Sequence, residues 1–285
     1  MLCENNLKPG LYVIATPIGN MDDITLRAIN TLKQVDTIYC EDTRNSQKLL
    51  QHHDIKNKLI ACHEHNEESL CTKIAAAIKD QKAVGLISDA GTPLINDPGY
   101  KIVKYLQDEK LGVFTVPGPS ALTAALSIAG VATDKFSYYG FFPTKKSSQD
   151  KIINILKYST HTYVFYEAPH RILKTLEILK NLPKSKNITL CKELTKIHEN
   201  TLSGSATDLI SHFDTNKDQL KGEFVILISN NKDQKDDDIS STQVNISIPN
   251  LLEILNKTLS KKDSSKLASE ISGVKSKILY NFLLR

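Results

Sequence analysis

The sequence predicts a protein of the α/β class with two α/β/α domains and a small helical domain at its C-terminal end. Apolar runs of strand length alternate with segments of helical periodicity from residue 10 to 229. The chain has 285 residues, more than one hydrophobic core usually organises. A polar, aperiodic segment then separates this region from three short amphipathic stretches. We therefore predict α/β domains over residues 1–117 and 118–230, a linker over 231–245 and a helical domain over 246–285.

The strands of the first domain are short, apolar and regularly spaced. They are expected at residues 11–15, 35–40, 59–62, 84–87 and 113–116. Helical periodicity follows several of them, for example at Leu26, Ile29 and Leu32 after a cap near Asp23 or Thr25. Repetition of strand and helix indicates right-handed crossovers and a mainly parallel sheet with its loops at one edge.

The loop after the fourth strand is the most unusual segment of the chain. Gly91 and Pro93 prevent a regular continuation, and Asp97 with Pro98 is expected to provide the N-cap and first-turn proline of the next helix. The connection has about nine residues, whereas two to six are typical. Because ligands of open α/β sheets bind at the carboxyl ends of strands, we expect a binding loop here.

The second domain repeats the pattern. Strands are expected at residues 136–142, 162–166, 188–191 and 222–229, and the turn at 117–120 opens a helix. The C-terminal residues 250–285 carry seven basic and three acidic side chains, so their excess of four equals the net charge of the whole chain. This indicates an anionic partner. The turn at 272–274 has the spacing of a helix-turn-helix, although any small helical cap gives the same spacing.

Composition narrows the class of protein. The five cysteines are scattered without a C-x-x-C pair, so neither a metal site nor a disulfide framework is expected. The N-terminal residues lack an apolar core of signal-peptide length, and no run approaches about 18 apolar residues. We therefore expect a soluble cytoplasmic protein.

Several loops, in this order, resemble one family. They are residues 15–20, 40–44, 65–66, 88–99, 117–120, 140–143, 165–171, 193–196 and 222–223. Taken together, they resemble the tetrapyrrole methylase (class III) superfamily of S-adenosylmethionine methyltransferases, and most closely its bacterial ribosomal RNA ribose methyltransferases. The resemblance implies a homodimer of two-domain chains with S-adenosylmethionine folded into the cleft between the domains. It also implies a specific substrate, cytidine 1402 (standard numbering) of 16S rRNA in the small ribosomal subunit.

The resemblance also assigns cofactor contacts by matching motifs. These are Pro17, Gly19, Gly91, Thr92, Pro93, Ile95, Ser120, Ala121, Tyr166, Phe224 and Val225. The assignment makes physical sense, because apolar side chains can pack on an adenine ring while backbone groups of Gly-Pro loops read its edge.

Methyl transfer to a ribose 2′-oxygen requires orientation of two substrates and profits from a base that takes the hydroxyl proton. The candidates are the polar strand ends Glu41, Asp42, His65, Asp89 and Glu193, none of which the sequence singles out. Cationic side chains suit phosphate contacts that fix the RNA. These are Arg44, Arg171, Lys192 and Lys196, and in the tail Lys261, Lys262, Lys275 and Lys277.

Three alternatives remain open. A methyltransferase of the same class could act on a tetrapyrrole or a protein side chain, although the basic tail argues against it. A nucleotide-phosphate-binding protein is disfavoured because the Gly91 loop lacks the lysine and hydroxyl of a P-loop. A non-catalytic RNA-binding module would use the α/β domains only as a scaffold.

Overall fold

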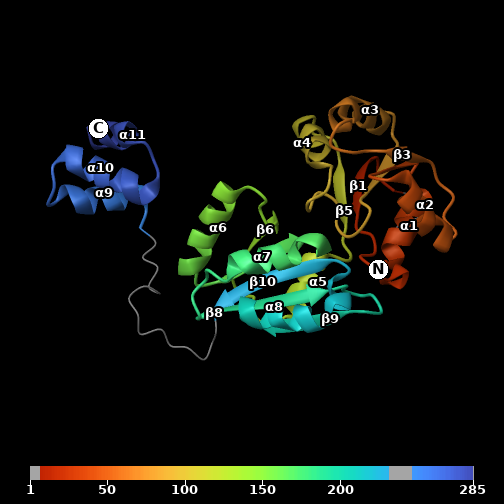
Figure 1. Ribbon diagram of the computed structural model, residues 1–285. Helices are drawn as coiled ribbons and strands as arrows, with labels where there is room; N and C mark the ends of the chain where they lie inside the picture. The colour runs from red at the N-terminus through yellow and green to blue at the C-terminus, as the bar shows by residue number, and fades with distance from the viewer. Residues whose placement is uncertain (1–6, 231–245, 285) are drawn as a thin grey trace. The chain divides into compact units, whose positions relative to one another are not determined.

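The computed structural model describes residues 7–230 and 246–284. The chain divides into two compact units, Met1–Lys235 and Asp236–Arg285 (Figure 1). The first unit contains two five-stranded sheets, and the second contains helices. The linker predicted over residues 231–245 lies outside the described residues, and the boundary predicted between residues 117 and 118 stays a prediction.

The first sheet is parallel in every pairing of its described strands, as the alternation of strands and helices predicted. Its strand order is β3-β2-β4-β1-β5. The strands are β1 (Gly10–Ile14), β2 (Thr37–Cys40), β3 (Leu59–Ala61), β4 (Ala83–Ile87) and β5 (Val113–Val116). All their carboxyl ends therefore meet at one edge, where the exit loops gather.

Helices cover both faces of this sheet (Figure 1). On one face, α1 (Leu26–Gln34) and α2 (Thr43–His52) bury side chains such as Leu32 and Leu50 against Ile14 and Ile38. On the other face, α3 (Glu67–Lys79) and α4 (Tyr100–Asp108) pack against β1 and β4. Thr25 caps α1, as predicted, by accepting a hydrogen bond from the Ala28 N–H at 3.0 Å. A short 3-10 turn, η1 (Met21–Asp23), precedes it.

The second sheet is mixed, with the order β6-β7-β10-β8-β9. Among its described strands, only β6 and β7 pair in parallel, whereas β10 runs antiparallel to both β7 and β8. The strands are β6 (Phe136–Phe141), β7 (Thr162–Glu167), β8 (Lys186–Lys192), β9 (Asn200–Gly204) and β10 (Phe224–Asn230). Because β10 is antiparallel to β7, the first residues of β10 lie beside the last residues of β7, with Phe224 paired to Glu167.

Within residues 7–230, four helices cover the second sheet. α6 (Lys146–Tyr158), α7 (Ile172–Leu179) and α8 (Ala206–Thr215) share one hydrophobic core with β7, β8 and β10. On the opposite face, α5 (Ala121–Ile128) packs against Val164, Cys191 and Val225. Ile18, from the exit loop of β1, belongs to this same cluster, so the two sheets are joined by apolar packing. The remaining 3-10 turns are η2 (Pro169–Arg171) and η3 (Lys217–Leu220).

The predicted cap of α4 is wrong. The helix begins at Tyr100 and its N-cap is Gly99, whose φ of +128° favours glycine. A carboxylate from another helix takes the place of a local cap. Glu67 of α3 accepts hydrogen bonds from the N–H groups of Gly99, Lys101 and Ile102 at 3.2, 2.6 and 3.2 Å. The side chain thereby satisfies three donors that the first turn of a helix leaves unpaired.

Some elements were not predicted at all. α2 has few apolar residues, and only Ser46, Leu49 and Leu50 of it are buried. β9 is a polar edge strand, paired on one side with β8. α8 begins with a capping box at Ser205 and Asp208.

The C-terminal unit contains the three predicted helices. They are α9 (Ile248–Asn256), α10 (Lys261–Ser272) and α11 (Ser276–Leu283). Leu252, Ala268 and Leu279 form its small core, and Gly273 ends α10 with a φ of +71°. None of the helices in the described part of the chain is long and apolar enough to cross a membrane.

Candidate active site

A cavity of about 360 Å³ lies where the loops of the first sheet meet the second sheet. The long loop after β4 contributes Ala90, Gly91, Thr92, Ile95, Asn96 and Asp97, and the start of α5 contributes Ser120 and Ala121. The second sheet contributes Phe141, Tyr166, Glu167, Phe224 and Val225. Ile18, Leu194, Ala168 and Pro169 add further apolar surface to the wall. The volume falls within the range of about 300–1,000 Å³ that holds small-molecule ligands.

Most of the residues that the motifs assigned to a cofactor line this cavity. They are Gly91, Thr92, Ile95, Ser120, Ala121, Tyr166, Phe224 and Val225. Pro93 is not among the lining residues, and Pro17 and Gly19 line a neighbouring pocket instead. Eight of the eleven residues therefore surround one cavity, and their contacts with a cofactor stay a prediction.

The loop after β4 is held in an unusual backbone conformation. Leu94 and Asn96 have φ values of +73° and +67°, which non-glycine residues rarely adopt. The loop is tied down by Thr92, whose hydroxyl donates to the Pro119 carbonyl at 3.0 Å. Tyr138 of β6 donates to the Asn96 side-chain oxygen at 2.7 Å. The ring of contacts includes both sheets, so the cavity wall is preorganised by each.

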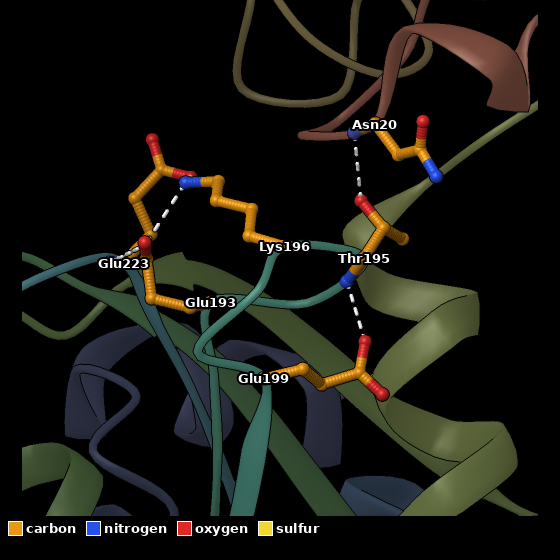
Figure 2. A network of polar contacts seen from close by, with 6 residues as sticks. All are labelled: Asn20, Glu193, Thr195, Lys196, Glu199 and Glu223. Carbon is orange, nitrogen blue, oxygen red and sulfur yellow. Dashed lines mark hydrogen bonds and ion pairs between the residues drawn. The ribbon is translucent and has the colours of Figure 1, made fainter.

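The loop after β8 forms a second connection between the sheets (Figure 2). The Asn20 N–H donates to the Thr195 hydroxyl at 3.1 Å. A Cβ added at Gly19 would lie 2.5 Å from Lys196 Cγ, so only glycine allows this close approach. Gly19 thus acts on the position of the 194–196 loop, and Leu194 of that loop lines the cavity.

An ion-pair network holds the loop after β8 to the start of β10 (Figure 2). Lys196 Nζ lies 2.9 Å from Glu193 Oε1 and 3.0 Å from Glu223 Oε2. Burial acts to raise the pKa of Glu193, but hydrogen bonds from Lys196 and from the Glu223 N–H outweigh it, so the pKa is lowered. A carboxylate held this firmly in its ionised form is a weak proton acceptor.

The other predicted base candidates differ in their surroundings. Hydrogen bonds from the Arg44 side chain and N–H lower the pKa of Asp42 to about 2, and Asp42 caps α2. His65 is exposed and lies outside the cavity lining. Burial, followed by the nearby charge of Asp89, raises the pKa of Glu41. Asp89 accepts hydrogen bonds from the Asp42 N–H and the Asn45 side chain at 3.0 and 2.8 Å.

Asp97 is a candidate that the sequence analysis treated only as a helix cap. It is half-buried and lines the cavity. Burial raises its pKa to about 6, and the charges of Glu41 and Asp89 add to this effect. A carboxyl group with a pKa near neutrality inside a ligand cavity is typical of a catalytic group. Its only sequence signal was its place in the long loop.

The cationic residues proposed to contact RNA fall into two groups. Arg44, Lys261, Lys262, Lys275 and Lys277 are exposed. Lys192 is buried, and Lys196 is held in the network of Figure 2. The Arg171 guanidinium lies 3.2 Å from the buried Glu167 carboxylate and also donates to the Phe142 carbonyl, so it stabilises the wall of the cavity.

Comparison with known proteins agrees with this geometry. The family model for Tetrapyrrole (Corrin/Porphyrin) Methylases matches residues 10–210. The chain belongs to this family.

Proteins called ribosomal RNA small subunit methyltransferase I are similar to this tetrapyrrole methylase over almost all of its length. The protein of that name from Escherichia coli O157:H7 is 37% identical, covering 98% of this chain and 96% of its own. The protein of that name from Rickettsia prowazekii (strain Madrid E) is 41% identical, covering 96% of this chain and 94% of its own.

Solved structures support the fold. The methyltransferase CobJ superposes with a TM-score of 0.58 at 16% identity, over 78% of this chain and 94% of its own. The cobalt precorrin-4 methyltransferase CbiF superposes with a TM-score of 0.56 at 18% identity, over 77% of this chain and 94% of its own.

Proposed function

We propose that this chain is an S-adenosylmethionine-dependent methyltransferase of the small ribosomal subunit, and that it methylates the ribose 2′-oxygen of cytidine 1402 (standard numbering) in 16S rRNA. The observation that carries the proposal is the extent of the similarity to ribosomal RNA small subunit methyltransferase I. The family model ends at residue 210, whereas those relatives match up to 98% of the chain at 37% identity. The choice of a ribose oxygen and of this cytidine rests on the loop motifs.

The cavity fits S-adenosylmethionine by the chemistry of its walls. Apolar and aromatic side chains such as Ile95, Phe224 and Val225 offer a surface for an adenine ring. Carboxylates of Asp97, Glu167 and Glu223 contribute the charged groups, and no lysine or arginine is found among the described residues that line the cavity. Glu167 and Glu223 are paired with Arg171 and Lys196, but neither cation lines the cavity, so a polyphosphate would have no cation there to bind it. The lining therefore disfavours a nucleotide-phosphate-binding protein.

The residues of the chain have three tasks in the proposed reaction. Bound S-adenosylmethionine supplies an electrophilic methyl group on a sulfonium centre. The preorganised loop after β4 orients it, because Thr92 and Asn96 tie that loop to the Pro119 turn and to β6. The acceptor hydroxyl must also lose its proton as the new bond forms.

We assign the role of proton acceptor to Asp97. A general base acts best when its pKa lies near the working pH, and the pKa of Asp97 is about 6. Asp42 and Glu193 are held as carboxylates by Arg44 and Lys196 and are poor acceptors. Burial is the main cause of the raised pKa of Asp97, and the charge of Glu41 adds to it. His65 lies outside the cavity lining.

The basic C-terminal unit is proposed to bind rRNA through its exposed lysines Lys261, Lys262, Lys275 and Lys277. Such contacts add affinity and orientation without reading sequence. Arg44, exposed beside the strand ends, is a further phosphate contact. We also propose a homodimer, which light scattering would detect as twice the chain mass of 31.8 kDa.

The test uses small ribosomal subunits that lack the modification. Wild-type protein should transfer radiolabelled methyl groups from S-adenosylmethionine to one ribose. Thr92→Trp should fill the cavity and lose both cofactor binding and transfer, because Thr92 lines it. Thr123→Trp is the matched control, since Thr123 is exposed on α5 outside the lining. Cofactor binding without label in RNA would leave a tetrapyrrole or a protein side chain as the substrate, and no binding would refute the proposal.

A further inference from the structure

A second pocket adjoins the cofactor cavity. It has a volume of about 230 Å³ and lies between the exit loop of β1, the first turns of α2 and the end of β4. Ile18 and Ala90 line both this pocket and the cofactor cavity. Methyl transfer requires donor and acceptor to be held side by side, and this is the geometry that two adjoining pockets with a common edge provide.

The walls of the second pocket differ from those of the first. Leu49 and Ile18 supply apolar surface, whereas Asn45, Lys48 and Asp89 supply an amide, a cation and a carboxylate. Leu49 is buried, and Lys48 is exposed. A lining that combines buried apolar surface, hydrogen-bonding groups and an exposed cation suits a nucleobase that carries its own phosphate.

Asp89 is fixed in position by α2. Its Oδ1 accepts from the Asp42 N–H at 3.0 Å, and its Oδ2 accepts from the Asn45 amide nitrogen at 2.8 Å. A carboxylate has about four acceptor sites on its two oxygens, so each oxygen can accept a further hydrogen bond. The hydrogen bonds from Asp42 and Asn45 orient the Asp89 carboxylate and thereby fix the direction of its unused acceptor sites.

We propose that this second pocket holds the acceptor nucleoside, with the amino group of cytosine donating to the Asp89 carboxylate and the ribose directed to the edge at Ile18 and Ala90. The inference rests on the proposed function and adds the site and the means of base selection. Asp89 is then a residue that selects cytosine, and Lys48 contacts a phosphate of the same strand.

The size and polarity of the pocket favour this occupant. Its volume is below the range of about 300–1,000 Å³ typical of pockets for larger ligands, so it suits one nucleoside better than a macrocycle. Cytosine presents an amino donor where uracil presents a carbonyl acceptor, and a carboxylate accepts from the former and repels the latter. Asp89 therefore discriminates against uridine by repulsion as well as by attraction to cytidine.

The first test fills the pocket. Asn45→Tyr places a ring in it, and Gln47→Tyr places the same ring on α2 at an exposed position outside its lining. We expect kcat/KM for small subunits to fall by at least roughly tenfold in Asn45→Tyr alone. The dissociation constant of S-adenosylmethionine, measured by calorimetry, should stay within about twofold of wild type in both variants. Equal subunit methylation by the two variants would overturn the inference.

The second test measures base selection. Asp89→Asn replaces an acceptor with a group that can also donate, so the preference for a target cytidine over a uridine at the same position should fall at least roughly fivefold. A purely structural loss would lower the methylation of cytidine-containing and uridine-containing small subunits equally. The ratio of the two rates would then stay at its wild-type value, which would contradict the inference. If the wild-type protein methylates neither kind of small subunit, the proposed function itself fails. If the wild-type protein methylates small subunits and both Asn45→Tyr and Asp89→Asn behave as wild type, only the assignment of this pocket fails.

Discussion

The contact between Glu67 and the start of α4 allows a quantitative prediction. One buried carboxylate from α3 accepts from three backbone N–H groups, at distances of 3.2, 2.6 and 3.2 Å. Glu67 is only 5% exposed. The helix that it caps follows directly on the loop that lines the cofactor cavity. Removing the carboxylate should therefore affect both stability and ligand binding.

The magnitude follows from the donors left without a partner. Each buried N–H that loses its acceptor costs about 1–3 kcal/mol. Local rearrangement and entering water reduce the sum, so Glu67→Ala should lower the free energy of unfolding by about 3–5 kcal/mol, the upper range of single substitutions. Glu67→Gln keeps an acceptor oxygen at the same place but loses the charge. Because charge-assisted hydrogen bonds are about twice as strong as neutral ones, we expect a loss of about 1–2 kcal/mol.

The control is the next residue in the chain. Glu68 is the same residue type, but its side chain is 87% exposed and lies 3.5 Å from Lys101 Nζ. An exposed ion pair of this kind contributes little, so Glu68→Ala should change stability by less than about 1 kcal/mol. Urea unfolding followed by circular dichroism measures all three variants, and calorimetry measures S-adenosylmethionine binding to those that fold. A Glu67→Ala variant as stable as Glu68→Ala would refute the role given to Glu67.

Two further predictions concern Asp97 and the tail. The folded-state pKa of Asp97, about 6, exceeds the ordinary 3.8, so this carboxyl favours the folded state at low pH and the contribution is lost as the pH rises through 6. Asp97→Asn should therefore be more stable than wild type at pH 7.5 by about 1 kcal/mol, a value reduced for partial exposure, and equally stable at pH 3.5. Asp97→Asn should also lower kcat/KM by at least about 100-fold. The rise in wild-type activity near pH 6, where Asp97 ionises, should be absent from this variant, and an unchanged pH profile would contradict the role of Asp97 as base. Deletion of residues 240–285 should weaken binding to small subunits and reduce its salt dependence while the affinity for S-adenosylmethionine stays unchanged, because the C-terminal helices form a separate compact unit. Unchanged subunit affinity in a filter-binding assay would exclude the tail as an RNA contact.

The strands of the first sheet could be predicted because each contains a short apolar run, although only β1, β2 and β4 are largely buried, whereas β3 and β5 are mostly half-buried or exposed. β4 and β5, for example, were expected at residues 84–87 and 113–116 and are found at Ala83–Ile87 and Val113–Val116. α2 could not be predicted from periodicity, because it buries only two large apolar side chains, Leu49 and Leu50. The local sequence therefore identifies the elements that carry a run or a stripe of apolar residues.

Contacts between distant segments explain the errors. Asp97 and Pro98 have the composition of a helix start, but the cap of α4 comes from Glu67, 32 residues before Gly99. The cavity role of Asp97 is also hidden in the sequence, because its raised pKa depends mainly on burial and then on the charges of Glu41 and Asp89. Gly19 was assigned to the cofactor from its motif, and this assignment stays a prediction, but its role in the close approach of the 194–196 loop could not be seen in the sequence. Such roles depend on tertiary structure, which propensity and spacing do not encode.

The most direct test of the account is the site of methylation. Small ribosomal subunits that lack the modification would be incubated with the wild-type protein and radiolabelled S-adenosylmethionine, and the labelled nucleotide mapped by nuclease digestion. The account predicts label on the ribose of cytidine 1402 (standard numbering) and its loss with Thr92→Trp but not with Thr123→Trp. Label on a base, on another nucleotide or on a ribosomal protein would contradict it.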